Sequence, residues 1–310
     1  MILPVVIDVI VPVFGVVVLG YLVGAFRWLD SGAVRGLSLY VFNIAIPLML
    51  FKAMSTVTLP EQMPWDYVLG FFACALGSFL TVFWLMRAAS VRSTGEVGVF
   101  AFGCSYGNFI PLGIPLVMTA FGEAATVPLF LLVALQAPVF FAPMILIQES
   151  AKQRERRGLI GWPVLKSIVA NQYLLGIGLG AAVNLLGLSL PGPISQIIAL
   201  ISQSAVPCAL FALGGALSFY AIEGVFSRAL AVVAVKNLLL PLLVWWVSHW
   251  LGLPPVWQAV MVVMAALPVG INTYLFAERD ECGQALAGTA VVLSTAVSVV
   301  TLSIVLSVLA

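Results

Sequence analysis

Long apolar stretches, separated by short polar connections, follow one another along almost the whole chain. Each stretch holds the roughly 20 residues that an α-helix needs to cross the hydrocarbon core of a bilayer. The pattern therefore predicts an all-α polytopic membrane protein with ten transmembrane helices. The predicted spans are 4–25, 33–53, 66–87, 97–120, 125–147, 167–188, 194–219, 229–251, 256–277 and 284–309.

A polar, basic stretch at 151–166 divides the chain into two halves, 1–150 and 167–310, with five predicted spans each. Glycine and proline positions recur between the halves at nearly constant offsets of 156, 160 and 157 residues. Because five is an odd number of spans, the second half enters the membrane from the opposite side, and the sequence predicts an inverted repeat. The recurring positions are Gly20 and Gly24 with Gly176 and Gly180, Pro47 with Pro207, and Pro111 and Gly113 with Pro268 and Gly270.

Two predicted spans carry matching motifs near their centres, PLGIP at 111–115 in span four and PVGIN at 268–272 in span nine. Proline removes a backbone donor and clashes with the preceding turn, and glycine adds conformational freedom, so we expect both helices to break there. In a bilayer such a break is tolerated where protein or a water-filled cavity satisfies the freed backbone groups. A matched pair of breaks is typical of a secondary transporter with its site at the breaks. The alternative is that the prolines only kink packed helices.

Polar side chains flank both breaks. Amides and hydroxyls there can bind a carboxylate together with the partly positive N-terminal ends of the half-helices. Polar residues at similar depth in other spans either line the same cavity or bond to neighbouring helices. The predicted substrate-binding residues are Asn43, Asn108, Gln136, Ser204, Asn272, Thr273 and Tyr274, and the predicted helix-break residues are Pro47, Pro111, Gly113, Pro115, Pro207, Pro268 and Gly270.

Charged residues make up 8% of the chain, whereas about a quarter is usual in soluble proteins. Ten alternating spans place all 13 lysines and arginines except Lys52 and Lys236 on one side, which the positive-inside rule makes cytoplasmic. We therefore expect an inner-membrane protein with both termini on the periplasmic side. Lys236 lies inside span eight, where a charge either serves function or reaches the interface on its flexible stem.

The sequence predicts no enzyme, no cofactor and no metal site. One histidine, four cysteines without a CxxC pair, and the absence of a GxxxxGK[ST] loop leave no metal or nucleotide motif. The balance of 13 basic and 12 acidic residues indicates no nucleic-acid partner. No carboxylate occupies either break, so we expect proton coupling or uniport and no sodium held by an aspartate pair. The candidates for a titrating group are Lys236, Asp8 and Glu123.

The runs 107–116 (GNFIPLGIPL) and 268–277 (PVGINTYLFA) are similar to the span-four and span-nine motifs of one known family. Weaker likenesses are 43–47, 207–214 and 293–295. On these motifs the sequence resembles the auxin efflux carriers, and the likeness covers essentially the whole chain. Its short central loop resembles that of their bacterial malate and malonate permease relatives.

The resemblance implies a 5+5 inverted repeat in which helices four and nine are broken and crossed, as in sodium/proton antiporters and bile-acid symporters. It also implies a scaffold, a moving transport domain of the elevator type, and a homodimer in the lipid bilayer. The implied function is secondary-active transport, by alternating access, of a small organic anion such as malate, malonate or an auxin-like weak acid. The alternative is a receptor that binds a ligand in the same pocket without moving it.

Overall fold

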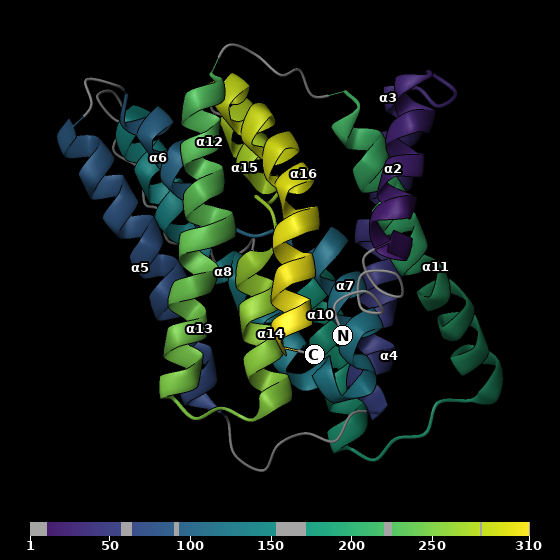
Figure 1. Ribbon diagram of the computed structural model, residues 1–310. Helices are drawn as coiled ribbons and strands as arrows, with labels where there is room; N and C mark the ends of the chain where they lie inside the picture. The colour runs from purple at the N-terminus through teal and green to yellow at the C-terminus, as the bar shows by residue number, and fades with distance from the viewer. Residues whose placement is uncertain are drawn as a thin grey trace.

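Figure 1 shows the computed structural model, which is all-helical across the residues that the structure describes, apart from one isolated β-bridge. These residues are 11–56, 64–89, 93–152, 172–219, 225–279 and 281–309. Asp8 and most of the predicted basic loop at 151–166 lie outside them. The helices are α2 (Val11–Ala25), α3 (Ser31–Tyr40), η2 (Val41–Ala45), α4 (Ile46–Thr56), α5 (Trp65–Ala89), α6 (Thr94–Gly103), η3 (Phe109–Gly113), α7 (Ile114–Phe121), η4 (Gly122–Ala125), α8 (Thr126–Lys152), α10 (Gln172–Leu185), α11 (Gly192–Leu217), α12 (Phe226–Ala234), η5 (Val235–Leu239), α13 (Leu240–Trp250), α14 (Pro255–Ala266), α15 (Asn272–Arg279) and α16 (Gln284–Leu309).

Six helical runs in the described part of the chain are long and apolar enough to cross a membrane, and three shorter apolar helices accompany them. Large apolar side chains point outward from these runs. Trp84 and Trp246, for example, are 67% and 63% exposed. Such a surface suits lipid rather than water, because soluble proteins rarely expose large contiguous apolar patches. The chain is therefore a polytopic membrane protein. The long runs are Ser31–Thr56, Trp65–Ala89, Phe109–Gln148, Gly192–Leu217, Phe226–Trp250 and Gln284–Leu309.

Glycines bring helices of the two halves into close contact. A Cβ atom on Gly20 of α2 would lie 2.1 Å from the carbonyl oxygen of Phe211 in α11. A Cβ atom on Gly176 of α10 would lie 2.4 Å from the carbonyl oxygen of Pro47 in α4. Both distances are too short for any side chain, so these glycines allow α2 to pack along α11 and α10 along α4. Figure 1 shows α2 and α11 together on the right of the molecule.

Pro47 and Pro207, predicted as helix-break residues, lie within continuous helical runs. Pro207 is inside α11, which continues to Leu217. Pro47 is the second residue of α4, directly after the π-helical turn η2, and the π-helical turn η5 likewise precedes Pro241. A π turn contains one extra residue and offers room where a proline ring would otherwise clash with the preceding turn. Proline at these positions is therefore accommodated within the helix.

Both spans with matching proline–glycine motifs are interrupted. The first unwound segment, 104–108, lies between α6 and η3, and the second, 267–271, lies between α14 and α15. The second coincides with its motif, but the first precedes PLGIP by one turn. A proline in the first turn of a helix removes only an N–H that has no helical partner there, so Pro111 is accommodated in the first turn of the resumed helix and does not end the previous one. Pro115 is the second residue of α7.

Candidate functional site

The two unwound segments are hydrogen-bonded to each other. The backbone N–H of Asn108 donates to the carbonyl oxygen of Pro268 at 2.9 Å, and the N–H of Gly270 donates to that of Tyr106 at 2.9 Å. Gly107 and Val269 thereby form an antiparallel β-bridge. A Cβ atom on Gly270 would lie 2.5 Å from the Tyr106 ring, so this approach requires a glycine. The interruptions thus meet, although they lie about half the chain apart in sequence.

Polar side chains from two other helices bind the remaining backbone groups of the unwound segments. Gln136 of α8 donates from Nε2 to the carbonyl oxygen of Gly107 at 2.8 Å. Ser294 of α16 accepts at its Oγ a hydrogen bond of 3.0 Å from the N–H of Val269. Backbone groups inside a membrane must be satisfied by protein or water. Gln136, predicted to line the site, therefore supports the first unwound segment, and Ser294 does the same for the second.

Lys236 binds the end of α14. Its side chain, on η5, is fully buried at 0% exposure, and Nζ donates to the carbonyl oxygens of Ala265 at 2.5 Å and Leu267 at 2.7 Å. In an unbroken helix the N–H of Val269 would bind the Ala265 oxygen, but that N–H is bonded to Ser294. The lysine supplies the missing donor, so it is a cap inside the protein and does not extend to the membrane interface.

Three buried polar atoms at the interruptions have no hydrogen-bond partner among the described residues: Ser105 Oγ, Asn108 Nδ2 and Thr273 Oγ1. Their residues are 4%, 3% and 1% exposed. Leaving such a group unpaired costs about 1–3 kcal/mol, so native proteins rarely do it without a reason. Two further atoms of this kind, Asn237 Oδ1 and Thr301 Oγ1, belong to residues that line a separate, mainly apolar groove. The unpaired groups at the interruptions are suited to bind a polar ligand.

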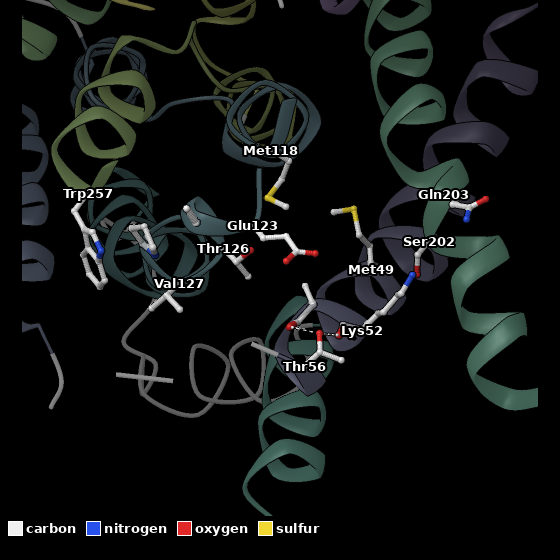
Figure 2. Close-up of a pocket in the computed structure, with 13 residues that line it drawn as sticks. Met49, Lys52, Thr56, Met118, Glu123, Thr126, Val127, Ser202, Gln203 and Trp257 are labelled. Atoms are coloured by element: carbon white, nitrogen blue, oxygen red, sulfur yellow. Dashed lines mark hydrogen bonds between the residues drawn. The ribbon is translucent and has the colours of Figure 1, made fainter. Parts of the chain in front are cut away.

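A cleft of about 890 Å³ separates α4 and α11 from α7, η4, α8 and α14 (Figure 2). Lys52 faces it from α4, and Glu123 faces it from η4. Met49 lines both this cleft and a small apolar gap that also contains Ile110 of η3. The cleft therefore leads toward the helix that resumes after the first interruption. Its other polar lining residues are Thr56, Thr126, Ser202, Gln203 and Trp257.

Other predicted site residues have partners or lie elsewhere. Asn272 donates from Nδ2 to the Tyr106 hydroxyl at 2.9 Å, which joins the two broken spans through side chains. Ser204 is bonded to the Tyr40 hydroxyl at 2.7 Å and thus links α11 to α3. Asn43 is exposed on η2, and Tyr274 is half-buried on α15. The structure therefore brings together residues 105–108, 267–273 and their supports, and leaves Asn43 and Ser204 outside this group.

A sequence profile of the family described as "Membrane transport protein" matches residues 5–306, nearly the entire chain. The chain belongs to this family. It is the auxin efflux carrier family, which the motifs of spans four and nine resemble. Two relatives cover almost the same length. A "putative malonate transporter" of Rhizobium meliloti (strain 1021) is 25% identical over 300 residues, which are 95% of this chain and 92% of the relative. An "uncharacterized transporter" of Methanothermobacter thermautotrophicus is 24% identical over 297 residues, 95% of each chain.

Sequence reasoning missed two residues of the first interrupted span as site residues, Ser105 and Tyr106, and it missed what Lys236 contacts. Ser105 and Tyr106 lie in the polar run directly before Asn108, and this run was the available signal. No local sequence pattern indicates the contact of Lys236 with the end of α14, because the carbonyls of Ala265 and Leu267 lie 29 and 31 residues further along the chain. Among the described residues, no group of three or more His, Cys, Asp or Glu side chains is placed to hold a metal ion. The chemistry available at the interruptions is hydrogen-bond donation, from neutral side chains and from the buried Nζ of Lys236.

Proposed function

We propose that the chain is a secondary-active carrier of a small carboxylate anion, with the substrate bound at the two unwound segments. The observation that carries this proposal is the buried, unpaired amide of Asn108, accompanied by the unpaired hydroxyls of Ser105 and Thr273. An anion accepts hydrogen bonds and donates none when fully ionised, so it fits an amide N–H and two hydroxyls.

The electrostatics of the interruptions favour an anion. The resumed helices begin at Phe109 and Asn272, and helix N-termini carry partial positive charge. Lys236 Nζ donates to the Leu267 carbonyl, and the backbone N–H of Asn108 donates to the carbonyl of the next residue, Pro268, so the lysine and the Asn108 backbone bind consecutive peptide units. The Rhizobium meliloti relative carries malonate in its name, which supports a short dicarboxylate as the first substrate to test.

Alternating access requires two bodies that move relative to each other. We propose that α2, α3, α4, α10 and α11 form the scaffold and that the other helices form a transport domain of the elevator type. The contacts of Gly20, Gly176 and Gly180 with carbonyl oxygens of neighbouring helices lie within the first group, whereas the cleft of about 890 Å³ lies between the groups. In this proposal the cleft is the entry on one side, and the apolar gap near Met49 and Ile110 separates it from Asn108.

A 5+5 inverted repeat with crossed spans is part of the same proposal. Reciprocal packing supports it: Gly20 of the first half lies against the Phe211 carbonyl of the second, and Gly180 of the second lies against the Phe51 carbonyl of the first. Gln136 and Ser294, which occupy corresponding positions in the fifth and tenth predicted spans, each bind a backbone group of the unwound segment in their own half. A homodimer, periplasmic termini and a proton as co-substrate complete the proposal.

Uptake and binding of labelled malonate test it in proteoliposomes and in detergent. Asn108→Ala removes a buried donor and is expected to weaken binding by roughly ten- to a hundredfold, since about 1.4 kcal/mol is tenfold in affinity. Asn108→Asp is expected to be worse, because it places a like charge beside the anion. The control is Asn184→Ala: this α10 amide binds the Met54 carbonyl in the scaffold, and anion affinity should stay at wild-type level.

The outcomes separate the candidate functions. Binding and transport by Asn108→Ala at wild-type levels would show that the interruptions are structural and that the site is elsewhere. A wild-type protein that binds malonate with Asn108-dependent affinity but moves none of it would be a receptor. Asn272→Ala is expected to weaken binding as well, here through loss of its bond to the Tyr106 hydroxyl.

A further inference from the structure

The buried ammonium of Lys236 is placed where a transporter with broken helices holds a cation. The C-terminal end of a half-helix carries partial negative charge, and unwound carbonyls at such ends coordinate sodium in other carriers. Here the two carbonyls at the end of α14 accept hydrogen bonds from Nζ at 2.5 and 2.7 Å. No described carboxylate forms an ion pair with Lys236, and its side chain is 0% exposed. These carbonyls are therefore its partners.

The first interruption has no corresponding charge among the described residues. At the end of α6 the Cys104 N–H turns back to the Phe100 carbonyl, and the neutral amide of Gln136 binds the Gly107 carbonyl. Among the described residues, the two interruptions thus share one lysine, whose Nζ binds the peptide unit next to the one that the Asn108 backbone N–H binds.

We propose that Lys236 is a tethered cation that fills the cation position of the second interruption, so that this carrier needs no bound sodium there. The inference rests on the proposed transport function and deepens it. The ammonium neutralises the carbonyl end of α14 and leaves a charge to balance one carboxylate of the substrate. In a sodium-coupled carrier the bound cation is released together with the substrate, whereas the Lys236 ammonium stays attached to the protein.

Chemical rescue tests the proposal, because a tethered cation can be replaced by a free one. Lys236→Ala removes three carbons and the ammonium, which is the size of n-propylammonium. We expect this variant to lose uptake by roughly tenfold or more, since a buried charged hydrogen-bond donor is lost. Propylammonium, and sodium to a smaller extent, is expected to restore uptake and to raise the melting temperature of the purified variant as the concentration rises. The isosteric neutral molecule 1-propanol is the ligand control.

Lys52→Ala is the matched protein control. Lys52 is an exposed lysine at the cleft, so its removal should leave the melting temperature insensitive to propylammonium. In the wild-type protein, replacing sodium by N-methylglucamine should change neither stability nor uptake. This measurement applies even when Lys236→Ala does not fold.

Sodium-dependent uptake by the wild-type protein would overturn the proposal. Three results with Lys236→Ala would also overturn it: uptake at the wild-type rate without added cation, equal stabilisation by 1-propanol and propylammonium, or an uptake and a melting temperature that respond to neither propylammonium nor sodium. The melting-temperature response of Lys236→Ala requires no anion. It therefore separates a failure of this inference from a failure of the Asn108 site.

Discussion

The contact between α2 and α11 can be tested with two glycines of one helix. Gly20 faces α11, and a Cβ atom there would lie 2.1 Å from the Phe211 carbonyl oxygen. Gly15 lies on the same helix, is exposed, and would place its Cβ atom with nothing within 4 Å. Gly20→Ala and Gly15→Ala are therefore the same chemical change in the same helix, and they differ only in what the new methyl group meets.

The magnitude follows from the distances. Ordinary van der Waals contact begins near 3.4 Å, so α2 must move by about 1.3 Å to accept a methyl group at Gly20. Alanine gains up to about 1 kcal/mol of helix propensity over glycine, and this gain cancels when the two variants are compared. Overpacking costs typically about 1–3 kcal/mol. We expect the upper part of this range, because the obstacle is a backbone carbonyl that cannot rotate away.

Thermal unfolding of the purified variants in one detergent measures the difference. We expect Gly20→Ala to melt several degrees below Gly15→Ala, since about 1 kcal/mol corresponds to roughly 2–4 °C for a chain of 150–250 residues. Gly180→Ala and Gly178→Ala form a second pair on α10. The Cβ atom at residue 180 would lie 2.4 Å from the Phe51 carbonyl oxygen, whereas the Cβ atom at residue 178 would lie in open space. Equal melting temperatures within both pairs would refute the close packing and the reciprocal contacts between the halves.

Three further predictions concern other contacts. Gln136→Leu leaves the Gly107 carbonyl without its donor, so thermal unfolding should show a loss of about 1–3 kcal/mol; unchanged stability would contradict this support. Arg228 and Glu96 form a partly exposed ion pair of 2.6 Å, so neutralising either residue should lower the free energy of unfolding by up to about 1 kcal/mol, and exchanging the two charges should recover most of this loss. A double-mutant cycle that shows no coupling energy between the two residues would rule the pair out. Cysteine labelling in cells should report residue 154 as cytoplasmic and residue 61 as periplasmic, and the reverse pattern would overturn the orientation.

The sequence by itself determined the class of protein and the neighbourhood of the site. Apolar stretches of membrane length, the recurring glycines and the paired proline–glycine motifs are local features, and local features govern helix formation and helix interruption. They correctly indicated a polytopic transporter of the auxin efflux carrier family and two interrupted spans. The inverted repeat, the orientation and the substrate stay predictions.

Only the tertiary structure decided which groups meet at the interruptions. Pro111 lies in the first turn of the resumed helix, and the interruption precedes it, where the Asn108 N–H turns to Pro268 of the other half. Lys236 reaches the Ala265 carbonyl across 29 residues of sequence, and the Asn272 amide reaches the Tyr106 hydroxyl across 166. A freed backbone group inside a membrane takes whichever donor or acceptor the packing of other helices brings within about 3 Å. That choice depends on distances between segments far apart in the chain, which no local pattern encodes.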